Sequence, residues 1–209
     1  LPAFGIAQNK LTITGKVKGV KEGQIISLTD VNRPADTLAK AKFSKGVFVL
    51  KAELKEPMIL NINMGDKKSL MTFLHNSSVK VAGDVNQLKE IKLTGSQLHN
   101  DFVDFKKTFD PLFEKLMKVN QQYQQGLRTD NIMMAMNTTK EDIQKGIDQF
   151  IEKRQSSAVS AFLIAATIQL NDDIYLTEKR MNSLKSSALE NMYGIYLKET
   201  IAEAKINAV

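Results

Sequence analysis

Hydrophobic and polar side chains alternate in short runs along residues 10–94. In "LTITGKVKG" the hydrophobic residues Leu11, Ile13 and Val17 are separated by smaller or polar ones, which is typical of a strand with one buried and one wet face. Further runs of this kind end at Gly, Asn, Asp or Pro and indicate about eight short strands. A sheet with one hydrophobic face needs a second sheet to cover it. The pattern therefore predicts an N-terminal antiparallel β-sandwich over residues 10–95.

After Gly95 the hydrophobic period lengthens from two residues to about three and a half. Hydrophobic side chains then recur at alternating spacings of four and three, which predicts a long helix with one hydrophobic side. Ser96 is the expected N-cap. Pro111 is expected to kink the helix, because it removes one backbone donor. The hydrophobic side consists of Leu98, Phe102, Phe105, Phe109, Leu112, Leu116, Val119 and Tyr123.

A second long helix is expected to begin near residue 138. The sequence "TTKE" at 138–141 matches a capping box, in which a hydroxyl and an acid three residues later satisfy free backbone donors. The stretch before it, residues 126–137, is looser. Two antiparallel helices that pack along their hydrophobic sides are the economical arrangement, so we expect a long helical hairpin. The second helix continues with Ile143, Ile147, Phe150 and Ile151.

Shorter helices are expected to follow. Ala158 to Ala166 is hydrophobic nearly all round, which indicates a helix buried on most sides. Thr177 is the expected cap of the next helix, with Met181 and Leu184 facing inward, and a last helix is expected from about Leu189. The fold class is therefore α+β: a sandwich over residues 10–95, then an all-helical region over residues 96–209.

The charge of the chain is modest but uneven. The net charge is +6 at pH 7. Residues 1–95 hold 15 Lys and Arg against 8 Asp and Glu, whereas residues 96–209 hold 14 against 15. A basic segment suggests nucleic acid or an anionic surface as partner. The lysines are scattered rather than consecutive, however, and we interpret them as the solvated faces of strands. No nucleic acid is expected as partner.

The cysteine count is zero, which excludes thiol nucleophiles, thiolate metal sites and iron–sulfur clusters. No stretch reaches the roughly 18 hydrophobic residues of a membrane-spanning helix. Residues 1–9 are expected to be a signal-peptide remnant or a tail, because Gly5-Ile6-Ala7 followed by Gln8 has the small-x-small form of a signal-peptidase site. We therefore expect export.

Candidate chemistry is sparse. The two histidines, His75 and His99, lack a second ligand at metal-binding spacing. Three carboxylate pairs are expected in or just before first helical turns, where acids favour the helix dipole. A methionine cluster is expected to be core or an adaptable contact surface. No catalytic, cofactor-binding or metal-binding residue is predicted, and no cofactor is expected. The pairs are Asp101/Asp104, Glu141/Asp142 and Asp172/Asp173, and the cluster is Met133, Met134 and Met136.

Several stretches together resemble a known family. The "ITGKV" opening, the "KFSKGVFVLKAEL" hairpin and the passage "LTGSQLHNDFVDF" into the first helix resemble a domain of unknown function. That domain, with a helical connector, precedes the thioredoxin-like domain of exported bacterial thiol–disulfide oxidoreductases. The end of the chain, "MYGIYLKETIAEAKINAV", is similar to the connector, so Val209 is expected just upstream of such a redox domain.

The resemblance implies a non-catalytic, periplasmic accessory module. Its partner would be a thioredoxin-like domain in cis, a client protein or a second copy of the chain. The family's Cys-x-x-Cys motif has no matching position here, so no catalytic residue is carried over. Three alternatives remain open: a stand-alone sandwich domain that binds an unknown ligand or protein, an enzyme with a new site at a carboxylate pair, and a binder of nucleic acid or anionic surfaces.

Overall fold

The structure, a computed structural model, describes residues 10–65 and 68–206. The predicted signal-peptide remnant or tail at residues 1–9 lies outside the described residues. The chain divides into two units, Leu1–Asn100 and Asp101–Val209, and each unit is described by itself. The division into sandwich and helical domains at residues 95 and 96 stays a prediction.

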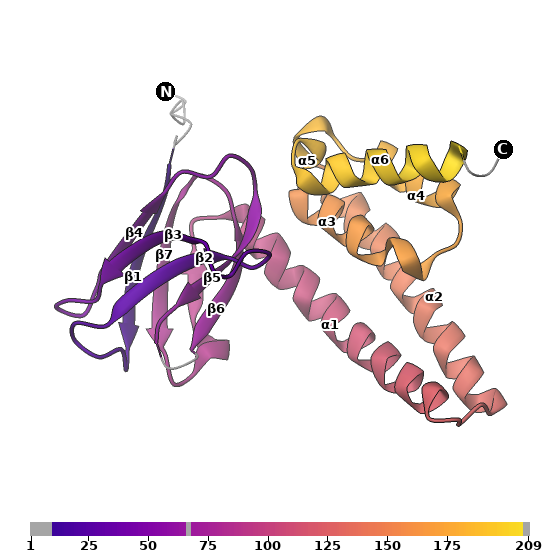
Figure 1. Ribbon diagram of the computed structural model, residues 1–209, viewed down its shortest axis with the longest axis horizontal. Coiled ribbons are helices and arrows are strands. Elements are labelled where there is room, and N and C mark those ends of the chain that lie inside the picture. The colour runs from indigo at the N-terminus through magenta and orange to yellow at the C-terminus, as the bar shows by residue number, and fades with distance from the viewer. Residues whose placement is uncertain (1–9, 66–67, 207–209) are drawn as a thin grey trace. The chain divides into compact units, whose positions relative to one another are not determined.

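Within the described residues, the first unit contains eight strands in two four-stranded sheets (Figure 1). One sheet has the strand order β4-β1-β7-β8, and the other has the order β3-β2-β5-β6. The α+β fold with an N-terminal β region is therefore confirmed. The strands are β1 (Leu11–Lys18), β2 (Ile25–Asp30), β3 (Thr37–Lys42), β4 (Phe48–Ala52), β5 (Met58–Asn63), β6 (Ser69–Leu74), β7 (Ser78–Asp84) and β8 (Lys92–Thr94).

The alternating residues form the core between the two sheets. Leu11 and Ile13 of β1 are fully buried, and they belong to the same hydrophobic cluster as Leu60 and Ile62 of β5 in the other sheet. Residues at alternate positions of a strand share one face, so the polar neighbours of these residues point outward. The burial of one face per sheet follows the alternation in the sequence.

The antiparallel arrangement is wrong for one pair of strands. β1 runs parallel to β7, with Thr12 opposite Ser78 and Lys18 opposite Asp84, and antiparallel to β4 on its other side. Alternation identifies the buried face of a strand but carries no information on the direction of its neighbour. The chain between β1 and β7 is long and includes strands of the other sheet. A connection of this length permits β7 to run either parallel or antiparallel to β1.

The helices of the described residues follow the sandwich, and α1 begins within the first unit. Their bounds are α1 (Gln97–Gln124), α2 (Asp130–Lys153), α3 (Ala158–Thr167), α4 (Ile174–Asn182), α5 (Ser186–Leu189) and α6 (Met192–Ile206). Short 3₁₀ turns are η1 (Leu88–Glu90) and η2 (Ile168–Leu170). None of these helices is both long and apolar enough to cross a membrane.

The two long helices form the predicted hairpin. The rings of Phe109 in α1 and Phe150 in α2 meet edge to face, with centroids 5.9 Å apart. Asp101, near the start of α1, pairs with Arg154, directly after α2. An early residue of one helix therefore meets a late residue of the other, as antiparallel helices require. The kink expected at Pro111, which lies within α1, stays a prediction.

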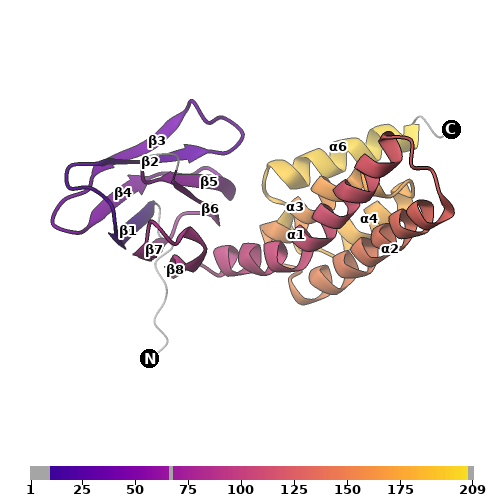
Figure 2. The same cartoon turned by 90° about the horizontal axis from the view of Figure 1, so that it is seen from below.

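The hydrophobic helix α3 is buried on most sides, as expected. Its buried residues include Val159, Ala161, Leu163 and Ile164. The last helix, α6, packs against α3 and α4 within the second unit (Figures 1 and 2). These neighbours explain why α3 has almost no polar side: several helices surround it, and little of its surface meets water.

The start of α1 is confirmed and that of α2 is corrected. The His99 amide donates to Ser96 Oγ at 3.2 Å, so Ser96 is the N-cap of α1. Helix α2 begins at Asp130, with Thr129 as its cap, and not near residue 138. Thr139 lies inside the helix, where its hydroxyl donates to the Ala135 carbonyl at 2.6 Å. The Met-rich stretch favours helix, so the capping-box match falls in a helix that is already formed.

The starts of the last helices are also corrected. Asp173, and not Thr177, caps α4, because its Oδ1 accepts hydrogen bonds from two amides of the first turn. The last helix begins at Met192, after the separate short α5 that ends at Leu189. Asn191 lies directly before α6 and accepts from the Gly194 amide at 3.3 Å. Asp and Asn side chains are good acceptors for the free amides at a helix start. Hydrophobic spacing runs through these two helix starts and therefore does not reveal them.

Candidate functional site

The two histidines have different environments. His75 is exposed and follows β6. His99 is buried in the first turn of α1, where its Nδ1 lies 2.7 Å from Thr72 Oγ1 of β6. Burial lowers the pKa of His99 below the ordinary 6.5, because desolvation disfavours the charged ring. Burial therefore favours the neutral ring of His99, and its contact with Thr72 ties α1 to the edge of the sandwich.

The carboxylate pair Asp101/Asp104 faces a cation. Arg154 Nε lies 3.3 Å from Asp101 Oδ1, and Arg154 Nη2 also contacts Asp104. The guanidinium lies over the ring of Phe150, 4.4 Å from its centroid. The expected first-turn placement is wrong for this pair, which lies in the second turn of α1. These contacts join the two helices of the hairpin, and the pair acts as a structural clamp.

The other two pairs do not form a site. Glu141 and Asp142 lie in the middle of α2 and not in its first turn, because α2 starts earlier than expected. Asp172 and Asp173 precede α4, as expected, and Asp173 serves as its cap. Among the described residues, no group of three or more His, Cys, Asp or Glu side chains is arranged to hold a metal ion. The prediction that no residue is catalytic, cofactor-binding or metal-binding stays a prediction.

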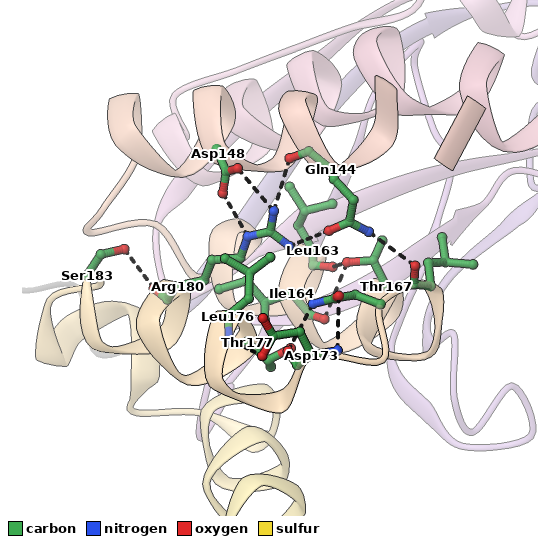
Figure 3. Close-up of polar contacts among 12 residues, drawn as sticks. Gln144, Asp148, Leu163, Ile164, Thr167, Asp173, Leu176, Thr177, Arg180 and Ser183 are labelled. Atoms are coloured by element: carbon green, nitrogen blue, oxygen red, sulfur yellow. Dashed lines mark hydrogen bonds and ion pairs between the residues drawn. The ribbon is translucent and has the colours of Figure 1, made fainter. Parts of the chain in front are cut away.

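A polar cluster that no sequence motif indicates surrounds Arg180 in α4 (Figure 3). Arg180 Nε donates to Asp148 Oδ1 at 2.7 Å, and Nη2 donates to Asp148 Oδ2 at 3.1 Å. Arg180 Nη1 donates to Gln144 Oε1 at 2.5 Å, and Nη2 reaches the Gln144 carbonyl at 3.1 Å. The Arg180 side chain is only 7% exposed. Both partners belong to α2, so the cluster fixes α4 to that helix.

The inward side of α4 is therefore more polar than expected. Its buried residues are Thr177 and Arg180, and Leu184 continues this side directly after the helix. Met181, which the hydrophobic spacing predicts to face inward, is only half-buried. A signal exists in the sequence, because Thr177, Arg180 and Leu184 follow helical spacing. An arginine in such a series usually points to a buried partner, but the sequence does not identify it.

An apolar pocket lies in the second unit between α1, α3, η2 and α6. Its volume is about 660 Å³, within the range of ligand-sized cavities. Its lining includes Phe105 and Phe162, whose rings meet edge to face with centroids 5.3 Å apart. None of the lining residues carries a charge. They are Phe105, Phe113, Leu116, Met117, Asn120, Phe162, Ala165, Ala166, Ile168, Gln169, Leu170 and Tyr196.

The rim of this pocket is accessible. Met117 of α1 is 63% exposed and Tyr196 of α6 is 44% exposed. Asn120 and Gln169 supply neutral hydrogen-bonding groups. The arrangement contains no titratable carboxylate, imidazole or amine, so it suits binding of an apolar group and not acid–base chemistry. The predicted hydrophobic side of α1 therefore contributes both to the core of the hairpin and to the lining of this pocket.

The β part of the chain matches a described family. Residues 11–102 match the model of a domain of unknown function, DUF4369. The DUF4369 segment contains all strands of both sheets and the first turn of α1. No curated protein matches the chain. The recognised part is thus the sandwich, whereas the apolar pocket lies in the helices after the DUF4369 segment.

The chain contains no cysteine, so it has no thiolate that could attack a disulfide. The exposed methionines Met133 and Met134 lie near the start of α2 and are not among the residues that line the apolar pocket. A contact role for the methionine cluster stays a prediction. The apolar pocket is therefore the candidate functional site, and its chemistry is that of binding.

Proposed function

We propose that this chain is a non-catalytic, extracytoplasmic binding module of a thioredoxin-like thiol–disulfide oxidoreductase, and that its apolar pocket receives the thioredoxin-like domain. The observation that carries the proposal is the uncharged, aromatic lining of an accessible pocket. Burial of apolar surface is the main favourable term in most protein contacts, and aromatic anchors are frequent among the strongest contributors. A partner with one protruding apolar segment would fill this pocket.

The choice of partner rests on the sequence. The DUF4369 match over residues 11–102 supports the resemblance of the sandwich to a domain of unknown function. The similarity of the helical end to the family's connector supports a thioredoxin-like domain as partner. Export is part of the proposal, and its support is the small-x-small sequence Gly5-Ile6-Ala7. The missing thiol supports a role in positioning a redox domain rather than in the exchange itself.

The test begins with the reading frame beyond Val209. The proposal expects a thioredoxin-like domain there, and that domain is purified separately and titrated into this chain by calorimetry. Met117→Glu places a charge on the pocket rim. Because Met117 is 63% exposed, the variant should fold, yet binding should weaken by about tenfold or more, since the carboxylate must lose water on contact.

Met134→Glu is the matched control, because Met134 is also a helical methionine and is 66% exposed but does not line the pocket. Its affinity should equal that of the unmodified chain. The proposal fails if no thioredoxin-like domain is encoded, if the domain does not bind, or if both variants bind alike. Self-association that Met117→Glu abolishes would instead identify a second copy as the occupant.

A further inference from the structure

Five lysines far apart in the sequence lie on one face of the sheet β4-β1-β7-β8. We call this outward surface the lysine face and define it by Lys16, Lys18, Lys51, Lys80 and Lys92. All five side chains are exposed. They come from each of the four strands of the sheet, so the surface exists only in the folded protein.

The strand register places these lysines together. On β1 the buried residues are Leu11, Ile13 and Val17, so the even-numbered residues of that strand point away from the core. Across the sheet, Thr12 lies opposite Lys51 and Thr14 lies opposite Lys80.

The next row of the face completes the set. Lys16 lies opposite Ala82, and Ala82 lies opposite Lys92. Strands are spaced by about 4.8 Å and residues by about 3.3 Å. The lysine face therefore covers on the order of 15 by 20 Å.

The charge of the lysine face is not neutralised. Among the described residues, no salt bridge involves any of its five lysines. The one acid at an outward position within the four strands is Asp84, opposite Lys18 at the end of β7, and its carboxylate accepts from the Asn86 amide. By the register and these spacings, every lysine of the face except Lys51 has another lysine within about one Debye length, roughly 8–10 Å, so the potentials of those four add.

We propose that the lysine face binds the anionic surface of a lipid bilayer. Lysine is a flexible point charge that suits phosphate groups without fixed geometry. Clusters of four to eight such cations are typical of attachment to anionic leaflets, with about a fivefold gain in affinity for each charge. The positions between the lysines are small or neutral, as Thr14 and Ala82 illustrate, so the ammonium groups are the most prominent part of the face.

Other anionic partners fit this surface less well. The outward positions of the sheet carry no aromatic ring and no arginine, and these groups stack on bases and read base edges in nucleic acids. A protein interface normally needs a buried aromatic or arginine anchor, and the largest apolar side chain among the lysines is Val49, 45% exposed. The inference is independent of the proposed thioredoxin-like partner, which concerns the other unit.

The experiment is vesicle co-sedimentation of the full chain. The probes are vesicles of phosphatidylcholine alone and of phosphatidylcholine with phosphatidylglycerol in a two-to-one ratio. Binding is expected only to the anionic vesicles, and it should be lost at about 0.5 M NaCl, where screening is short-ranged. The triple variant Lys16→Gln, Lys80→Gln and Lys92→Gln should weaken binding by about a hundredfold, from three factors of about five.

The matched control removes the same three charges elsewhere. Lys107, Lys115 and Lys118 are exposed lysines of α1, and their replacement by Gln should change vesicle affinity only severalfold or less. Circular dichroism of both triple variants verifies that they fold. The inference is overturned if anionic vesicles are not bound at low salt, or if both variants lose affinity equally. It is also overturned if poly-glutamate or single-stranded DNA binds the lysine face more tightly than the vesicles do at the same salt.

Discussion

Replacement of Arg180 by methionine tests the attachment of α4 to α2. Methionine preserves the length and most of the packing of the side chain but removes the guanidinium and its four hydrogen bonds, to Asp148 and Gln144. Each hydrogen bond to a charged group contributes about 1.5–3 kcal/mol, and a broken buried pair costs about 3–5 kcal/mol.

The expected loss lies below the simple sum of these bonds. The Asp148 side chain is 57% exposed, so its carboxylate regains water when the arginine is removed. The Gln144 side chain also donates to the Leu170 carbonyl and keeps that bond. We therefore expect Arg180→Met to lower the free energy of unfolding of the helical unit by about 2–4 kcal/mol.

Urea unfolding followed by far-ultraviolet circular dichroism measures this loss, because the helices of the second unit dominate the signal. With a slope near 1.5 kcal/mol/M, a loss of about 2–4 kcal/mol should lower the midpoint by about 1.3–2.7 M at unchanged slope. Lys179→Met is the control: it removes a charge from the adjacent, exposed position and should cost less than about 0.5 kcal/mol. Equal midpoints for the two variants would refute the stabilising role of the cluster.

Two further predictions concern a glycine and a histidine. A Cβ at Gly194 would lie 2.1 Å from the Leu189 carbonyl oxygen, so Gly194→Ala should lower the thermal midpoint by several degrees at a cost of about 1–3 kcal/mol. Gly146→Ala, whose Cβ would meet only a ring edge at 3.2 Å, should be close to neutral, and an equal loss in both would contradict this explanation. Burial lowers the pKa of His99, so the unfolded chain holds that proton more tightly and the first unit should lose stability as the pH falls below 6.5. His99→Gln should remove most of this loss in thermal melts, and an unchanged pH profile would exclude His99 as its source.

The sequence predicts burial within an element better than it predicts how elements pair. The alternation around Ile13 and the three-and-four spacing around Phe105 identify the buried faces, because the side chains of a strand repeat every two residues and those of a helix every 3.6. The parallel direction of β7 beside β1 depends on a connection through the other sheet, which no local pattern records. The sequence does not identify the helix start at Asp130, because Thr129, Thr138 and Thr139 are all acceptable N-cap residues and the sequence alone does not choose among them.

The candidate sites depend still more on tertiary structure. Gln144 and Asp148 are ordinary polar residues of a helix until α4 brings Arg180 against them. The scattered lysines of the first unit predict solvated strand faces, and those of the lysine face are exposed on strands. Their convergence on a single face requires the order β4-β1-β7-β8, which the sequence does not show.

The central place of β1 in its sheet has a consequence for biogenesis. Within its sheet this strand is synthesised before the others, so both of its partners, β4 and β7, become available only later. Until β7 has been translated, at least one backbone edge of β1 has no native partner strand. Pairings between strands so far apart in the sequence also form slowly. A nascent chain of this protein thus presents an unpaired, strand-forming segment for a long interval, and such segments need protection from aggregation.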